Sequence, residues 1–89
     1  MATIHAERTP NPNSLKFTAS QGQFREDVAA FSSAAEAEDD PLAHELFSLS
    51  EVVDVFITPE FVTVSKQADA AWADAKPAIT EILKNHLEG

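Results

Sequence analysis

Two apolar runs separated by a short proline-containing turn dominate the pattern of hydrophobic and polar positions. Residues 52–57 read VVDVFI and residues 61–66 read FVTVSK, and both are rich in the β-branched and aromatic residues that favour strands. The turn at residues 58–60 contains Pro59, which cannot take the positive φ of the primed hairpin turns, so we expect a loop based on a type I turn. The pattern predicts a β-hairpin over residues 52–66.

Side chains alternate between the two faces of a strand, which assigns the hairpin residues to two sets. The apolar set is Val53, Val55, Ile57, Val62 and Val64. The opposite set contains Asp54, Thr63, Ser65, Phe56 and Phe61. We therefore expect one face of the hairpin to pack against the rest of the chain.

Two more segments alternate in the same way near the N-terminus. Residues 3–8 and 14–19 predict strands, the second with Leu15, Phe17 and Ala19 on one face. Residues 9–13, TPNPN, lie between them and combine two prolines with two asparagines, which is strong turn chemistry. The segment predicts two strands joined by a rigid loop.

Residues 20–40 carry the weakest pattern. Residues 28–31 favour a short strand, and residues 32–38 favour a helical turn because Ser33 and Glu36 have capping-box spacing. An acidic patch follows, formed by Glu36, Glu38, Asp39 and Asp40. We expect a solvated loop whose end complements the N-terminal dipole of the next helix.

A helix is predicted over residues 41–49. Asp40 suits the N-cap, and Pro41 suits the first helical position, where its missing N–H is not needed. Its buried stripe is expected to be Leu42, Ala43, Leu46, Phe47 and Leu49.

A longer helix is predicted over residues 70–87, with Asp69 as its N-cap. Its apolar face has helical spacing and comprises Trp72, Ala75, Ile79, Ile82, Leu83 and His86. Trp72 could bind a ligand, but this spacing favours a core position. Pro77 removes a backbone hydrogen bond inside the pattern, so we expect a kinked helix, or a short turn followed by a helix over residues 77–87.

Together these elements predict an α+β fold. A small antiparallel sheet, made of the hairpin 52–66 and the strands near 3–8 and 14–19, is expected to be packed on one face by helices near 41–49 and 70–87. The length of 89 residues predicts a single domain over residues 1–89 with one modest core.

The charge balance limits the classes of molecule that the chain could bind. The chain carries 15 acidic and 6 basic residues, for a net charge of −9, and the scattered cations form no stripe that could neutralise phosphates. We expect neither nucleic acid nor an anionic membrane as a partner. The start of the chain has no basic residues followed by an apolar run, and there is no cysteine, so we expect a cytoplasmic location.

The residues offer little for catalysis or metal binding. With only Gly22 and Gly89, no phosphate-cradling loop can form, and the common catalytic motifs are absent. Asp40 and His44 could share a metal with Asp39, but two residues at i and i+4 more often form an ion pair. His5 and His86 are expected to be solvated or packed. We predict no enzyme, no catalytic or metal residues and no cofactor.

Two features are candidate interaction surfaces. Phe56 and Phe61 flank the hairpin turn and would favour a partner, unless another segment covers them. The loop that includes Asn11, Pro12, Asn13, Ser14 and Lys16 has a fixed backbone and several donors. It could equally be a structural turn whose asparagines bond to nearby backbone groups.

Several stretches in order along the chain resemble one family. They are TPNPNSLKF (9–17), DPLA (40–43) with LF (46–47), Val52 with VF (55–56), FVTV (61–64), and Trp72 with KP (76–77). They resemble the N-terminal domain of Nfu/NifU-like iron–sulfur cluster scaffold proteins, over nearly the whole chain. One departure is Glu51, where the family often has glycine, and it argues against a left-handed helix cap.

The resemblance implies a role but not the chemistry of the scaffold. In such proteins the cluster is held by a C-x-x-C motif in a separate C-terminal domain, and this chain has no cysteine. We therefore expect a non-catalytic interaction module that acts in cluster assembly or delivery without holding the cluster. Its partner would be a scaffold, a carrier or a recipient apoprotein. The alternative is a stand-alone adaptor or regulatory domain unrelated to iron–sulfur clusters.

Overall fold

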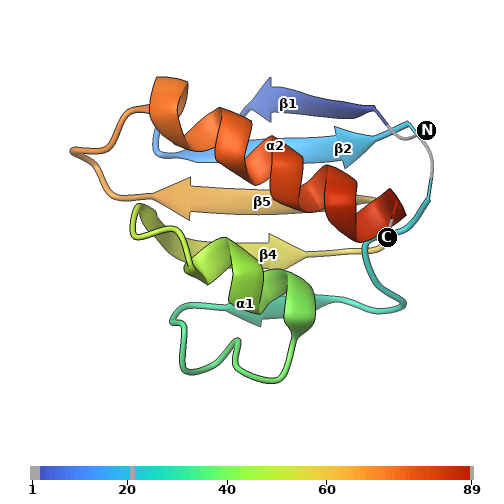
Figure 1. Cartoon of the computed structure of the whole chain (residues 1–89). Helices are drawn as coiled ribbons and strands as arrows, with labels where there is room; N and C mark the ends of the chain where they lie inside the picture. Colours follow the sequence, from blue (N-terminus) through green and yellow to red (C-terminus); the bar gives the residue numbers. More distant parts are fainter. Residues whose placement is uncertain (1–2, 21, 89) are drawn as a thin grey trace.

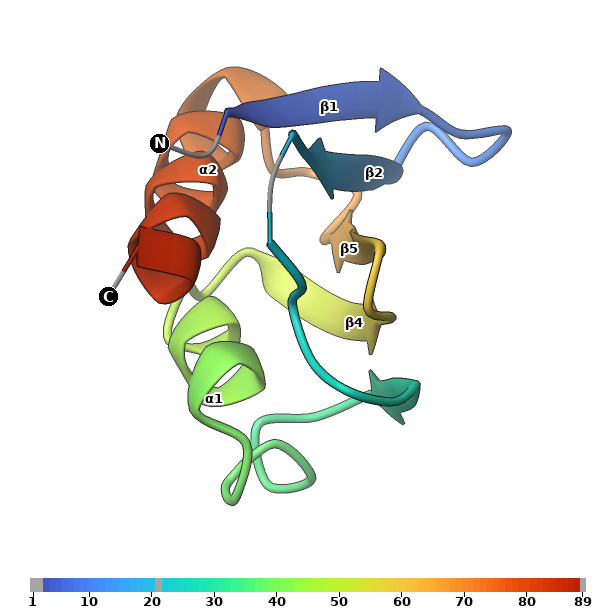
Figure 2. The same cartoon turned by 90° about the vertical axis from the view of Figure 1, so that its right-hand side faces the viewer.

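The structure is a computed structural model that describes residues 3–20 and 22–88. Five strands form one antiparallel sheet, and two helices pack on one of its faces (Figures 1 and 2). The elements are β1 (Ile4–Arg8), β2 (Ser14–Ala19), β3 (Ala29–Phe31), α1 (Pro41–Phe47), β4 (Val52–Ile57), β5 (Phe61–Lys66) and α2 (Trp72–Glu88). The predicted α+β class is confirmed.

The predicted hairpin lies in the middle of the sheet, whose strand order is β1-β2-β5-β4-β3. β5 pairs with β4 on one side and with β2 on the other, so that Val62 lies opposite both Ile57 and Phe17. The hairpin loop is closed by Thr58, whose N–H donates to the Phe61 carbonyl at 2.8 Å. Among the described residues no non-glycine has a positive φ, so the loop is not a primed turn.

Val53 does not lie where strict alternation places it. Val52 pairs with Lys66 and Asp54 pairs with the adjacent Ser65, so Val53 is an extra residue on β4, as in a β-bulge. The bulge turns Val52 into the core and leaves Val53 40% exposed. The assignment of Val53 to the apolar face was wrong, whereas Val55, Ile57, Val62 and Val64 are buried as predicted.

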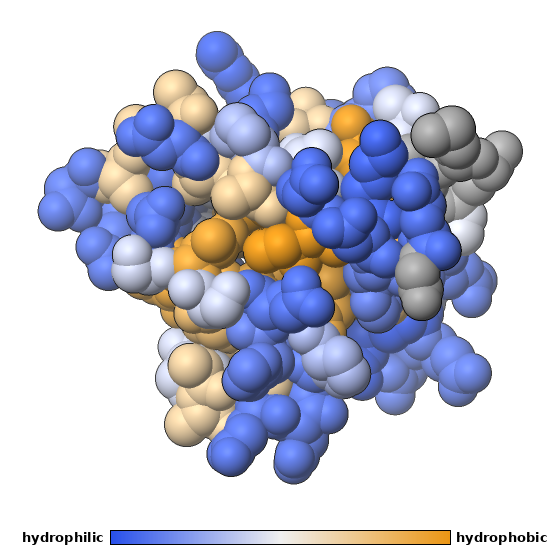
Figure 3. All heavy atoms as spheres, in the orientation of Figure 1, coloured by the Kyte–Doolittle hydropathy of each residue, from blue (hydrophilic) through white to orange (hydrophobic). Residues whose placement is uncertain are grey.

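The core lies between the sheet and the two helices. Its largest fully buried side chains are Phe17, Leu46, Ile57, Ile79, Leu83, Val55, Val62 and Val64. Figure 3 shows hydrophobic side chains at the centre of the helix-bearing face, ringed by hydrophilic ones. The apolar faces of the sheet and of the two helices therefore meet in one hydrophobic core.

Helix α1 begins as predicted and ends earlier. The Asp40 carboxylate accepts from the Ala43 N–H at 3.0 Å, and Pro41 occupies the first turn. The helix stops at Phe47 instead of residue 49: the Leu49 N–H donates to the Leu46 carbonyl at 3.2 Å, three residues back instead of the four of an α-helix. Ser48 keeps a right-handed φ of −66°, so the helix has no left-handed cap there.

Helix α2 differs from the prediction at its start. Ala70 N–H donates to the Gln67 carbonyl, while the first helical bond runs from Ala75 N–H to the Ala71 carbonyl, each at 3.1 Å. The helix therefore begins at Trp72, and Asp69 lies in a separate preceding turn and is not its N-cap.

The rest of α2 settles two further expectations. It continues through Pro77 to Glu88, so the alternative of a short turn followed by a second helix was wrong. Of its predicted apolar face, Ala75, Ile79 and Leu83 are buried, whereas His86 is exposed and its Nε2 lies 3.0 Å from the Phe24 carbonyl oxygen.

Residues 22–40 wrap around one edge of the sheet. The short strand expected over residues 28–31 is present as β3, paired with β4. Residues 32–39 form turns and bends in place of a helical turn, although Ser33 Oγ accepts from the Glu36 N–H at 3.2 Å as a capping serine would. Phe24 and Ala37 are buried in the core, which the sequence pattern did not indicate.

Candidate interaction surface

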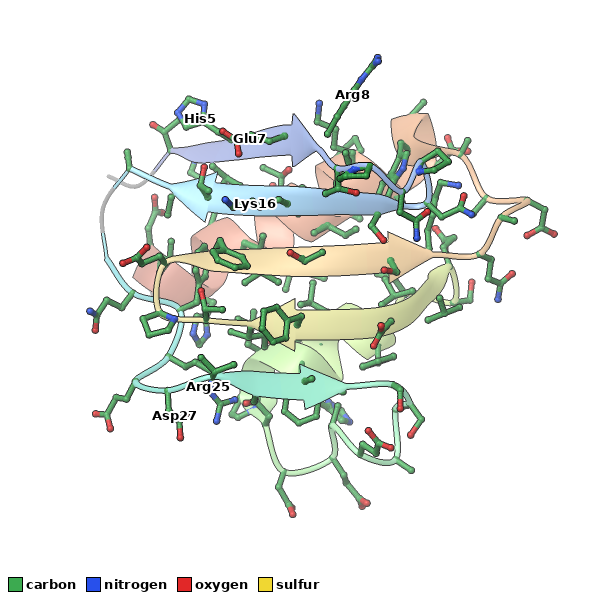
Figure 4. The ribbon with its side chains drawn as sticks, turned by 180° about the vertical axis from the view of Figure 1, so that it is seen from behind. His5, Glu7, Arg8, Lys16, Arg25 and Asp27 are labelled. Carbon is green, nitrogen blue, oxygen red and sulfur yellow. The ribbon has the colours of Figure 1, made fainter. Side chains whose placement is uncertain are left out.

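The aromatic pair lies on the face of the sheet opposite the helices. Figure 4 views this face, and both helices lie behind the sheet. Phe56 on β4 points to this side because it lies between Val55 and Ile57, which face the core. Its side chain is 39% exposed, so no described segment covers it.

Three side chains from three neighbouring strands form a group that we call the aromatic patch: the exposed Phe56 and the half-buried Lys16 and Phe61. The two rings lie 6.0 Å apart at an angle of 49°, a tilted arrangement that aromatic pairs favour. Lys16 Nζ lies 4.7 Å from the centre of the Phe61 ring, within range of a cation–π interaction. The patch combines flat apolar area with one positive charge.

The loop between β1 and β2 is fixed by its own hydrogen bonds. Thr9 Oγ1 lies 2.9 Å from the Asn11 carbonyl oxygen and accepts from the Asn11 N–H at 3.2 Å. Asn11 Oδ1 accepts from the Asn13 N–H at 2.9 Å, and the Asn11 carbonyl accepts from the Ser14 N–H at 3.0 Å. The bonds made by the Thr9 and Asn11 side chains are local contacts with the backbone, as expected if the loop is a structural turn.

Contacts with distant parts of the chain hold the same loop. Trp72 Nε1 donates to the Pro12 carbonyl at 3.0 Å, which joins the start of α2 to the loop. Lys66 Nζ donates to Asn13 Oδ1 at 3.1 Å and to the Gln67 carbonyl at 3.2 Å, and lies 5.6 Å from the centre of the Trp72 ring. Lys66 is only 7% exposed.

The seven predicted surface residues thus fall into two places. Lys16, Phe56 and Phe61 come together on the open sheet face, whereas residues 11–13 lie in the loop before the start of β2. Asn11 and Pro12 are exposed and Asn13 is half-buried. Ser14 is buried, and its Oγ lies 2.6 Å from Ser65 Oγ, so its side chain supports the sheet instead of facing solvent.

Trp72 and Lys66 are the residues near the loop that sequence reasoning did not place there. Trp72 was assigned to the core, yet it is half-buried and faces the loop across 60 positions of sequence. Lys66 extends the inward series of Val62 and Val64, and this position within the alternation was the available signal for its burial.

The histidines do not gather with carboxylates. Asp40 forms an ion pair with Arg25, not with His44, through one carboxylate oxygen, while its other oxygen caps α1. His44 and His5 are exposed. Across residues 3–20 and 22–88 no group of three or more His, Cys, Asp or Glu could hold a metal ion. Neither described helix is long and apolar enough to cross a membrane.

Comparison with known proteins identifies relatives over nearly the whole chain. The family model for the N-terminal part of the scaffold protein Nfu/NifU matches residues 4–89. A NifU-like protein of Schizosaccharomyces pombe is 34% identical over 94% of this chain and 33% of its own length. The human mitochondrial NFU1 iron–sulfur cluster scaffold homolog is 39% identical over 85% of this chain and 30% of its own length.

Solved structures give the same result for the fold. A NifU-like protein from Saccharomyces cerevisiae superimposes with a TM-score of 0.81 at 26% identity, covering 93% of this chain and 76% of the yeast chain. A protein from Staphylococcus aureus shares the fold with a TM-score of 0.73 at 21% identity, covering 89% of this chain and 95% of its own.

The match to the family model extends across both strands of the central hairpin, both helices and the loop that carries TPNPNS. The chain spans about a third of the length of the two curated relatives described above. It belongs to the Nfu/NifU N-terminal family of iron–sulfur cluster scaffold proteins.

Proposed function

We propose that this domain is a non-catalytic protein-interaction module that acts in iron–sulfur cluster assembly or delivery without holding the cluster itself. The observation that carries the proposal is that this chain, although it belongs to a family of cluster scaffold proteins, has no cysteine that could bind a cluster. Iron–sulfur clusters are held mainly by cysteine thiolates, and none of the 89 residues is cysteine. Carboxylates and isolated imidazoles are poor substitutes for four thiolates.

The partner is a protein that carries or receives a cluster: a scaffold, a carrier or a recipient apoprotein. The aromatic patch supports this choice, because accessible aromatic side chains are typical anchors of protein interfaces, and here Phe56 is exposed and contacts the half-buried Phe61. The exposed residues of the loop, Asn11 and Pro12, offer a second and separate contact area before the start of β2. The net charge of −9 disfavours nucleic acid as a competing partner.

The first test is anaerobic reconstitution with ferrous iron and sulfide, with and without a separate protein domain that contains a C-x-x-C motif. We expect no visible cluster absorbance from this chain alone and normal absorbance from the C-x-x-C domain. A stoichiometric cluster on this chain alone would contradict the proposal.

The second test measures capture of cluster-carrying proteins by the immobilised chain. Replacing both rings, Phe56→Ser with Phe61→Ser, should weaken capture by about tenfold or more, as for hot-spot residues. Val53→Ser is the control. Val53 lies on the same strand as Phe56 and is about as exposed, at 40% against 39%, but does not belong to the aromatic patch. Equal capture by the double variant would remove the aromatic patch from the interface.

The same capture experiment separates the alternative function. Recovery of partners without any connection to clusters, in an extract where C-x-x-C proteins are present, would favour an independent adaptor domain. Cytoplasmic location remains part of the proposal, although several relatives are named as mitochondrial proteins. Cell fractionation with an antibody against the domain decides between the two compartments.

A further inference from the structure

A hollow of about 390 Å³ lies where the β1–β2 loop meets the first residue of α2. Its wall is formed by Arg8, residues 9–12, the start of β2 at Ser14 and Leu15, and Trp72. The volume falls at the lower end of the ~300–1,000 Å³ that is usual for ligand sites. The hollow is large enough for a short piece of extended polypeptide.

The wall is rigid before any ligand arrives. Pro10 and Pro12 restrict the backbone, and the loop bonds to itself through Thr9 and Asn11. The bond from Trp72 Nε1 to the Pro12 carbonyl fixes the indole ring against the loop. A site that is already ordered loses little conformational entropy on binding.

The described lining of the hollow carries one positive charge and no negative one, although the molecule is strongly acidic. Arg8 is the charged residue of the lining, and Figure 4 shows its side chain pointing outward from the β1 edge of the sheet. None of the described residues that line the hollow is acidic, whereas two other hollows of similar size contain Glu38 and Glu45.

A second positive charge, that of Lys66, lies 5.6 Å from the centre of the indole ring. The ammonium of Lys66 is buried and bonds to two neutral oxygen atoms, those of Asn13 and Gln67. In the described part of the chain the ion pairs within 4.0 Å are those of Arg25, so no described carboxylate lies within 4.0 Å of the charged groups of Arg8 or Lys66. The field of a buried charge is screened less than that of an exposed one.

We infer that this hollow binds a short polypeptide segment in which a carboxylate lies next to an apolar side chain. The apolar side chain would pack on Trp72 and the two prolines, and the carboxylate would accept hydrogen bonds from the Arg8 guanidinium. The carboxylate belongs either to an aspartate or glutamate side chain or to the C-terminus of the partner. The inference deepens the proposed function, because it gives the loop a ligand of defined chemistry.

The chain contains its own probe for this site. Trp72 is the only tryptophan and there is no tyrosine, so the intrinsic emission reports directly on the wall of the hollow. Three synthetic peptides distinguish the sources of the carboxylate. The first is acetyl-Gly-Ser-Phe-Glu-Gly-amide, the second is acetyl-Gly-Ser-Gly-Phe with a free C-terminus, and the third replaces glutamate in the first by glutamine.

We expect a saturable change in emission with the first or the second peptide at concentrations below about 1 mM. The glutamine peptide should bind at least about tenfold more weakly, which is the usual effect of losing one charged hydrogen bond. Binding of the first peptide alone assigns the site to side-chain carboxylates, and binding of the second alone assigns it to chain ends. No saturable change with either of the first two peptides would overturn the inference. If the first peptide binds, equally strong binding of its glutamine variant would also overturn it.

Arg8→Gln supplies the matched variant, because Arg8 is exposed and its replacement should leave the fold intact. It should weaken binding of the acidic peptide about tenfold. Lys84→Gln is the control. It also removes one positive charge, but from a residue of α2 about 18 Å along the helix from Trp72. Unchanged binding by Arg8→Gln would overturn the inference.

This test is independent of the cluster proposal. Phe56→Ser should leave peptide binding unchanged, since Phe56 lies on the opposite face of the sheet from the helices. Failure of the peptides to bind would remove the hollow as a site and would leave capture of cluster proteins by the aromatic patch to be judged separately.

Discussion

Val53 and Val55 show how one extra residue changes the environment of a side chain. Both belong to β4 and are two positions apart, yet Val55 is fully buried and Val53 is 40% exposed. The register shift beside Val53 adds one residue between the paired positions, which breaks the period of two. Hydrophobicity alone does not distinguish the two valines, because only the pairing partner reveals the shift.

The bulge predicts different costs for the same substitution at the two positions. Val55→Ala removes two buried methyl groups and should lower the free energy of unfolding by about 2 kcal/mol. Val53→Ala should change it by less than about 0.5 kcal/mol, as surface substitutions usually do. Urea denaturation of both variants provides the measurement. Equal losses would show that the two valines are buried alike.

Residue-level prediction from the sequence worked where a side chain's environment follows from its own strand or helix. Alternation placed Val62, Val64 and the ring of Phe56 on their correct faces. It could not place Trp72, because the Pro12 carbonyl that binds its indole lies 60 positions away. The hollow beside Trp72 was invisible in the sequence for the same reason.

Helix α2 shows how packing overrides a local preference at the scale of an element. Pro77 is its sixth residue and cannot donate a hydrogen bond to the Ala73 carbonyl. The helix nevertheless continues, because Ala75, Ile79 and Leu83 on both sides of the proline lie buried against the sheet. The energy of this burial offsets the missing bond.

Replacing Pro77 therefore has a predicted direction. Pro77→Ala restores the N–H and should raise the free energy of unfolding by about 1–2 kcal/mol, somewhat less than the full ~3 kcal/mol penalty of an interior proline. Pro41→Ala is the matched control and should have little effect, because the first helical position needs no N–H. Thermal unfolding followed by circular dichroism measures both. A less stable Pro77→Ala protein would refute this explanation.

Residues 22–40 mark the limit of prediction for whole elements. The short strand β3 was expected and is present, paired with β4, but the burial of Phe24 and Ala37 was not expected. These two residues are buried because other elements close over them, and no local period indicates this. By contrast, α1 was found from Asp40 and Pro41, whose capping chemistry acts within one turn.

At the scale of the whole molecule, negative charges far outnumber positive ones. The net charge is −9, and the radius of gyration is only 11.7 Å. At about 0.01 M salt the Debye length is about 30 Å, so every carboxylate repels the others across the entire fold. Among the described residues the ion pairs within 4.0 Å are those of Arg25, one with the exposed Asp27 and one with the partly buried Asp40.

Salt should consequently stabilise the protein. Raising sodium chloride from about 0.01 to about 0.15 M shortens the Debye length to about 8 Å and should raise the unfolding midpoint by a few degrees, since about 1 kcal/mol corresponds to ~4–8 °C in a domain of this size. Potassium chloride should act equally if the effect is screening. A midpoint that falls or stays constant would show that attractive pairs outweigh the repulsion.

The position of β2 between β1 and β5 has a consequence for synthesis on the ribosome. β1 and β2 are made together, but Ser14 must wait for Ser65, 51 positions later, to complete its side of the sheet. At about 5–20 residues per second, this interval lasts about 3–10 s. Throughout that interval the growing polypeptide exposes an unpaired strand edge that is open to aggregation, so a chaperone would act most usefully before residue 66 emerges.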